Sequence, residues 1–284
     1  MRPSDAARLV ALAAIWGASF IFMRVAAPQF GAVLTADLRM LIAGAALAGW
    51  FAATGVDIEW RRYWRQYALL GCVSSAVPFG LFAFAALHIP APLSAVLNAA
   101  APMFGALAGA LWLGERLSVR RCVGLASGAA GVALVSRPEG FGDSALFVWA
   151  VLACLGATVC YGVIGVLIRR FAPQASARGM AAGSQLGAGL LCLLLVPLAL
   201  PPATPSAVAT LNLLALGLLC TAVAYLLYFR LIVDLGATRA LTVTYLIPMF
   251  GLLWGWLFLG ERLPPTALAG GALIVAGTVL VTRG

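Results

Sequence analysis

Long apolar stretches and short polar breaks alternate along the whole chain. Ten of the stretches contain about 20 mostly apolar residues, which is the length that a helix needs to cross a bilayer. They cover residues 8–27, 33–54, 66–87, 89–112, 119–136, 145–168, 178–200, 207–229, 238–260 and 264–282. The pattern predicts an all-α membrane protein with ten transmembrane helices and almost nothing left for a soluble domain.

The chain repeats itself at long range. Residues 102–137 and 248–283 align without a gap, and 19 of the 36 aligned pairs are identical. The front of each half matches more weakly, with "WGAS" at 16–19 facing "LGAT" at 155–158. The first apolar stretch, which follows Arg2 and Arg8 like a secretory signal, therefore belongs to the repeat and is predicted to be a retained helix.

The repeat divides the chain into two five-helix units, 1–137 and 138–284. Because five is odd, the second unit enters the membrane from the opposite side, and the two units form an inverted repeat. Inverted repeats are typical of secondary transporters, whose substrate binds near the midplane between the units. A duplicated structural bundle would show the same repeat.

The composition supports a membrane location, and we expect no nucleic-acid partner. Apolar residues make up 63% of the chain and charged residues 10%, against about 25% charged in a soluble domain. The net charge of +9 comes from arginines alone, most of them between the apolar stretches. With the N-terminus inside, 14 arginines lie in cytoplasmic segments and four elsewhere. Both termini are therefore predicted to be cytoplasmic, in a multi-pass protein of the bacterial inner membrane.

The reactive side chains are few and scattered. The six cysteines form no CxxC pair, the chain has one histidine, His88, and lysine is absent. We expect no metal site and no cofactor. A multi-spanning enzyme of lipid metabolism, the alternative from another functional class, would need clustered acidic, histidine or lysine side chains. The predicted protein is therefore not an enzyme.

Aromatic and neutral polar side chains recur at matched positions of the two units. Phe79 and Phe82 align with Tyr225 and Tyr228, and Asn98 aligns with Thr244. Each aromatic pair is three residues apart and so shares one helix face. Any one of these rings could simply pack between helices, but together they could line a cavity for an amphipathic solute. The predicted substrate-binding residues are Trp16, Ser19, Phe20, Phe79, Phe82, Asn98, Thr158, Tyr161, Tyr225, Tyr228, Thr244 and Tyr245.

Proline and glycine also occupy matched positions. Pro102 and Pro248 fall near the middle of the fourth and ninth spans, where a proline removes a backbone hydrogen bond and allows a kink. We expect them to act as kink or gating residues. The GxxxG pairs, such as Gly124 with Gly128, favour close helix packing within one molecule over dimerisation. The expected state is a monomer, with membrane lipid around it and a small-molecule substrate.

These motifs resemble a known family. The "WGASF" helix at 16–20, the proline-containing fourth and ninth helices that end in "LGER", and the glycine-rich fifth and tenth helices are similar to the ten-helix EamA branch of the drug/metabolite transporter superfamily. The resemblance covers essentially the whole chain and is greatest to the bacterial YddG-type exporters of aromatic amino acids. It implies a secondary transporter that exports such amino acids, or similar amphipathic metabolites, by alternating access. The alternative within the superfamily is an exporter of drugs, lipophilic cations or other metabolites.

The acidic residues bear on energy coupling. None lies deep in a span, and Asp37 is about a turn into the second span with Arg39 two residues away. We expect Arg39 to hold Asp37 ionised. The sequence therefore predicts facilitated diffusion or exchange, without an obligatory proton on a buried acid.

Overall fold

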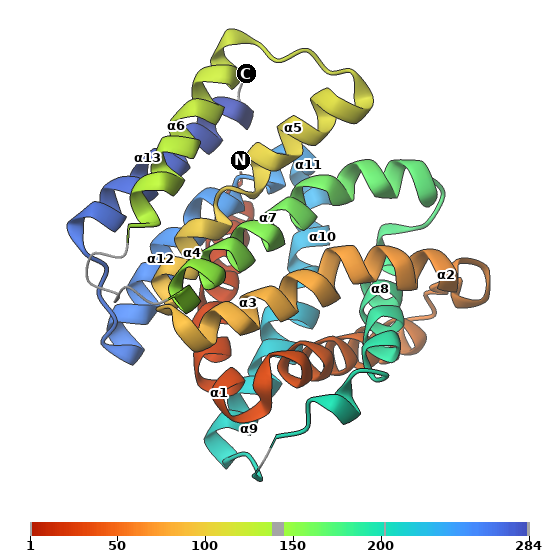
Figure 1. Cartoon of the computed structure of the whole chain (residues 1–284). Helices are drawn as coiled ribbons and strands as arrows, with labels where there is room; N and C mark the ends of the chain where they lie inside the picture. The colour runs from red at the N-terminus through yellow and green to blue at the C-terminus, as the bar shows by residue number, and fades with distance from the viewer. Residues whose placement is uncertain (1, 138–144, 202, 283–284) are drawn as a thin grey trace.

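The computed structural model describes residues 2–137, 145–201 and 203–282, and within these ranges the regular structure is helical (Figure 1). The predicted boundary between the two units, at 137/138, falls at the edge of a segment outside the described residues. Many large apolar side chains on the exterior are exposed, including Leu111, Trp149 and Val233. An apolar exterior is expected where lipid surrounds the helices.

The first two predicted spans lie in one element, α1 (Pro3–Ala53), which has 51 residues. A straight helix of that length would extend about 77 Å, far more than one bilayer. The chain instead changes direction at Gly31, whose φ of 75° and ψ of 162° are not helical (Figure 1). Glycine adopts such a conformation without a steric penalty. The expected loop between the two spans is thus reduced to one residue.

The remaining predicted spans each coincide with helical segments. In the first half these are α2 (Trp60–Gly71), η1 (Cys72–Ala76), α3 (Val77–His88), α4 (Ala91–Asn98), α5 (Ala101–Leu113) and α6 (Val119–Val135). In the second half they are α7 (Ala145–Phe171), α8 (Ala177–Cys192), η2 (Val196–Leu198), α9 (Ala207–Gly217), η3 (Leu218–Val223), α10 (Ala224–Leu235), α11 (Ala237–Ala240), α12 (Val243–Leu259) and α13 (Pro265–Thr282).

Six continuous helical stretches of the described chain are long and apolar enough to cross a membrane, and α12 is a shorter apolar helix. The predicted span 178–200 is wrong at its end. Its α-helix stops at Cys192 and only a short 3₁₀ turn follows, at Val196–Leu198, because Pro197 and Pro201 cannot continue an α-helix. The span predicted at 66–87 begins earlier, at Trp60.

Several irregular features occur at repeat-related places. The π-helical segments η1 and η3 begin at Cys72 and Leu218, which are 218 − 72 = 146 residues apart, the same offset as in the sequence repeat. Gly114 and Gly260, also 146 apart, both end a helix in the left-handed conformation, with φ of 69° and 66°. The all-α membrane fold with two inverted repeats is confirmed.

Helices α6 and α13 cross closely through small residues. A methyl group added to Gly124 would lie 2.7 Å from the carbonyl oxygen of Gly277, and one added to Gly131 would lie 2.6 Å from that of Gly270. Only glycine permits backbones to approach this closely. The glycines of these two helices therefore pack against one another inside the molecule.

Candidate substrate cavity

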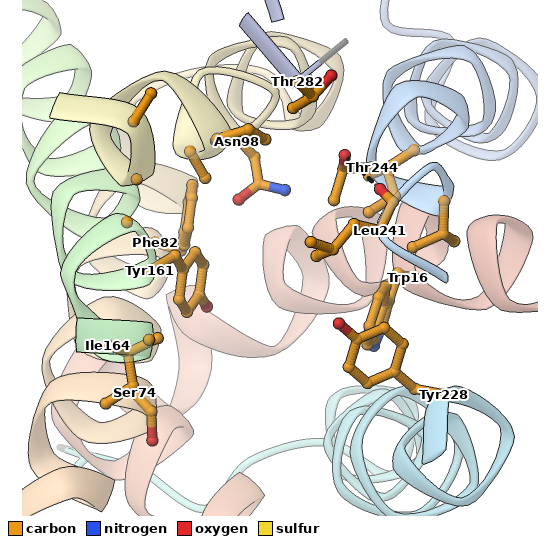
Figure 2. Close-up of a pocket in the computed structure, with 18 of the residues that line it drawn as sticks. Trp16, Ser74, Phe82, Asn98, Tyr161, Ile164, Tyr228, Leu241, Thr244 and Thr282 are labelled. Atoms are coloured by element: carbon orange, nitrogen blue, oxygen red, sulfur yellow. Dashed lines mark hydrogen bonds between the residues drawn. The ribbon is translucent and has the colours of Figure 1, made fainter. Parts of the chain in front are cut away.

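A cavity of about 670 Å³ lies between the two halves of the molecule. Its wall is made mainly by α1, α3, α4 and α5 of the first half and by α7, η3, α10, α12 and α13 of the second half. Figure 2 shows Trp16, Asn98, Tyr161 and Tyr228 around one open space, each from a different helix. The volume is in the range of pockets that hold small organic molecules.

Aromatic rings form two groups on the cavity wall. Phe82 packs edge-on against Phe20 with ring centroids 5.5 Å apart, and lies nearly parallel to Tyr161 at 6.2 Å. Trp16 and Tyr228 form the second group, at 5.3 Å, and Figure 2 shows them across the space from Phe82 and Tyr161. Both units contribute to each group, so the two halves build the aromatic lining together.

Neutral polar groups stand between the rings. The hydroxyl of Ser19 donates to the Trp16 carbonyl at 2.6 Å, and that of Thr244 donates to the Leu241 carbonyl at 2.8 Å. Asn98 differs from both, because its side-chain oxygen is buried without a hydrogen-bond partner among the described residues. Buried amide oxygens normally have a donor, so a rotation of this side chain towards the cavity would let the oxygen accept from a bound molecule.

The two ends of the cavity differ. At one end the wall includes Glu115, Arg121 and Arg169, near the ends of their helices, together with Thr282 near the C-terminus. The ends of the helices on the opposite face are joined by Glu261, whose carboxylate accepts from Arg24 Nε at 3.0 Å and from the Ala91 backbone N–H at 2.8 Å. The cavity thus reaches the face on which α13 ends, and on the other face the Glu261 carboxylate links helix ends.

The chain also matches a family of known proteins along nearly its whole length. The model of the EamA-like transporter family matches residues 6–137 and, separately, residues 148–283. The chain belongs to this family. It is therefore a multi-pass membrane transporter of small molecules and not an enzyme, and each half of the molecule corresponds to one EamA unit.

Individual relatives agree with this assignment of an EamA-like transporter. The chain is 29% identical over 276 residues to a protein of Streptantibioticus cattleyicolor named as a probable terminal-alkyne amino-acid exporter, covering 97% of this chain and 92% of the relative. It is 26% identical to YedA of Escherichia coli, named as an uncharacterized inner membrane transporter, over 97% of this chain and 90% of that protein. A solved crystal structure superposes with a TM-score of 0.68 at 24% identity, covering 100% of this chain and 98% of the other, which shows the shared fold.

Most of the predicted substrate-binding residues of this EamA-like transporter lie on the cavity wall. These are Trp16, Ser19, Phe20, Phe79, Phe82, Asn98, Tyr161, Tyr225, Tyr228 and Thr244. Thr158 lies off the wall, fully buried, with its hydroxyl donating to Leu155 of its own helix. Tyr245 is also off the wall and is hydrogen-bonded through its hydroxyl to Thr282. The role of all twelve as substrate ligands stays a prediction.

The two prolines occupy different positions from each other. Pro102 is the second residue of α5 and follows a turn at residues 99–100, so its missing N–H, in the first turn of the helix, costs no hydrogen bond there. It lies on the cavity wall. Pro248 is inside α12 and buried off the wall. Pro102 thus lies mid-span, as expected, at a turn within the stretch Ala91–Leu113, and Pro248 lies inside α12. A gating role for either remains a prediction.

The structure places Arg39, which was not predicted as a site residue, on the cavity wall. The expected pairing of Arg39 with Asp37 is wrong. Arg39 Nε donates to the hydroxyl of Thr221 at 2.9 Å, and both carboxylate oxygens of Asp37 are buried without a hydrogen-bond partner in the described chain. Two residues along a helix is a turn of about 200°, so the two side chains point in nearly opposite directions. The sequence signal for Arg39 was a charged residue inside an apolar span.

Proposed function

We propose that this EamA-like transporter exports aromatic amino acids, or similar amphipathic metabolites, across the bacterial inner membrane by alternating access. The observation that carries the proposal is the aromatic cavity between the repeats, in which the rings of Phe82, Tyr161 and Tyr228 stand beside neutral polar groups such as Asn98. Rings on the wall can stack on an aromatic side chain. The polar groups can hydrogen-bond to an amino-acid head group.

The difference between the two ends of the cavity supports alternating access. An inverted repeat can adopt two related conformations, in which the halves exchange their arrangements and the site opens to the other face. The contacts of Glu261 with Arg24 and Ala91 hold together the helices on the closed face. Their rupture, with closure of the opposite face, would complete one transport step.

The relative from Streptantibioticus cattleyicolor, whose name specifies an amino-acid exporter, supports amino acids as the substrate class. The preference for aromatic ones rests on the rings of the cavity wall. YedA of Escherichia coli supports the inner membrane as the location. We further propose units bounded at 1–137 and 138–284. We also propose a monomer, because the glycines of α6 and α13 pack within the molecule.

Counterflow into proteoliposomes tests the proposed function. Vesicles loaded with unlabelled phenylalanine should take up labelled phenylalanine faster than protein-free vesicles, and unlabelled tryptophan or tyrosine should compete. Glucose and tetraphenylphosphonium are the comparison solutes. Counterflow of tetraphenylphosphonium without any counterflow of amino acids would replace this proposal with a lipophilic-cation exporter.

The proposed orientation has a separate test. With both termini cytoplasmic, the segments around Arg65 and Arg121 are inside and the junction after His88 is outside. Single cysteines at these places, in a variant without the six native cysteines, should react with an impermeant maleimide in intact cells only at the junction after His88. Labelling at residue 65 from outside would reverse the orientation.

A further inference from the structure

Arg39 is a buried cation held in a fixed position. Its side chain is on the cavity wall, and the residue is only 6% exposed. Nε donates to the Thr221 hydroxyl at 2.9 Å, and the guanidinium carbon lies 3.8 Å from the centroid of the Phe79 ring. The Thr221 hydroxyl in turn donates to the Leu216 carbonyl at 2.9 Å, within the π-helical part of its span. One hydrogen bond and one ring face therefore orient the guanidinium plane.

The charge of Arg39 has no counterion within residues 2–137, 145–201 and 203–282. None of the ion pairs of the described chain includes it, and Asp37 turns away. A guanidinium has five N–H donors, and only the one on Nε has a hydrogen-bond acceptor here. A charged side chain near the centre of a bilayer is costly and rare, so such residues mark a functional site by default.

The surroundings of the guanidinium are neutral and polar. The phenol rings of Tyr161 and Tyr225, both on the cavity wall, lie close enough to interact with its charge. Arg39 lies eight residues beyond the Gly31 break, or about 12 Å along α1, and so well inside the membrane. The inner part of the cavity is therefore positive, with hydroxyl groups around the charge.

We propose that Arg39 binds the carboxylate of the transported solute through its two terminal nitrogens. This inference rests on the proposed function and names the group that the site recognises. The planar fork of a guanidinium matches a carboxylate with two parallel hydrogen bonds. A bound carboxylate supplies the missing counterion, and the apolar part of the solute then lies against rings such as Phe82. The site selects for a carboxylate and against lipophilic cations.

Competition between solutes that differ in one group tests this assignment. Two unlabelled competitors are added to the phenylalanine counterflow assay. One is 3-phenylpropionate, which has the carboxylate without the amine, and the other is phenylalanine amide, which lacks the carboxylate. In the wild-type transporter we expect 3-phenylpropionate to compete and the amide to compete about 10- to 100-fold more weakly than phenylalanine. In Arg39→Gln this preference for acid over amide should fall to about twofold or less. Arg39→Lys, which keeps the charge and loses the fork, should be intermediate.

Two further variants separate binding from a structural role. Thr221→Val leaves Arg39 charged but removes the acceptor of its Nε, and it should reduce the acid-over-amide preference several-fold. Arg65→Gln, at an exposed position on α2 and off the cavity wall, is the matched control and should keep the wild-type preference. Thermal unfolding in detergent checks that each variant is folded. If Arg39→Gln does not fold, Arg39→Lys and Thr221→Val decide the question.

The outcomes distinguish this inference from the proposed function. Two outcomes overturn the role of Arg39 while amino-acid transport stands. One is inhibition of phenylalanine counterflow by the amide as strong as that by the acid, and the other is an unchanged acid-over-amide preference in folded Arg39→Gln. Uptake of labelled 3-phenylpropionate that needs Arg39, without uptake of any amino acid, supports the inference and overturns amino acids as the proposed substrate class. Uptake of phenethylamine alone, undiminished in Arg39→Gln, overturns both.

Discussion

Asn98 is a polar side chain on the cavity wall whose oxygen bonds to nothing in the described chain. It ends α4, and a turn at Ala99–Ala100 leads to α5. The amide therefore lies where two helices of one span meet at the cavity wall. The ammonium group of an amino acid is a suitable donor for it.

Asn98→Ala should lower the rate of phenylalanine counterflow about tenfold, because a hydrogen bond to a charged group is lost. Asn212→Ala is the matched control, since Asn212 is on α9, away from the cavity wall, and donates to the Val208 carbonyl of its own helix. Both variants should insert and unfold like the wild type. Equal rates for Asn98→Ala and Asn212→Ala would move the substrate away from Asn98.

Asp37 lies off the cavity wall and cannot meet the solute directly in this conformation. We therefore expect Asp37→Asn to transport phenylalanine at about the wild-type rate, within twofold, and neither protein to require a pH gradient. Uptake into proteoliposomes, with and without an imposed gradient, measures this. Concentrative uptake that depends on the gradient and disappears in Asp37→Asn would make Asp37 a coupling residue.

At the residue scale, sequence reasoning found the aromatic side chains that recur in the repeat and missed Arg39 as a cavity residue. Phe82 and Tyr228 stand at aligned positions, and both reach the cavity. Arg39 was assigned to Asp37 because the two are close in sequence, although a separation of two residues on a helix turns side chains apart. Thr158 and Tyr245 were predicted from alignment alone, which does not specify the direction in which a side chain points.

At the scale of helices, the hydrophobic pattern predicted the segments and not their irregularities. The length of an apolar stretch predicts a membrane span well, since the thickness of the bilayer is nearly constant. The same pattern is compatible with i−4 or i−5 hydrogen bonding, so η1 and η3 could not be foreseen from it. The pattern located the turn between residues 27 and 33, where Gly31 lies, but it did not show that the two helices would join there without a loop.

The crossing of α6 and α13 gives a prediction about stability. Gly124→Ala would bring a methyl group to 2.7 Å from the Gly277 carbonyl oxygen, and the resulting overpacking should destabilise the fold by about 1–3 kcal/mol. Gly49→Ala is the control, because nothing lies within 4 Å of a methyl group there and alanine is the better helix former. Thermal unfolding in detergent should show a lower midpoint for Gly124→Ala alone. A midpoint as high as that of Gly49→Ala would mean that the helices do not cross this closely.

At the scale of the whole molecule, the two glutamates of the repeated "LGER" motif have different partners. Glu261 binds both Arg24 and the first N–H of α4, whereas Glu115 at the aligned position contacts Arg121 at 3.5 Å. The α4 residue that Glu261 binds, Ala91, aligns with Ala237, the first residue of α11. In the opposite conformation of an inverted repeat, Glu115 should therefore close the other face at α11.

Because the two glutamates have different partners, each stabilises one of the two conformations of the transporter. Glu261→Ala should shift molecules away from the conformation described here, and Glu115→Ala should shift them towards it, each by about tenfold in the ratio of the two populations if about 1.4 kcal/mol is lost. The double variant should return close to the wild-type ratio. Spin labels on the two faces, read as distance distributions, would measure the populations. Shifts in the same direction for both single variants would show that the glutamates do not exchange roles. A facilitative transporter with balanced populations can work in either direction, so these two side chains would set the preferred direction without contacting the solute.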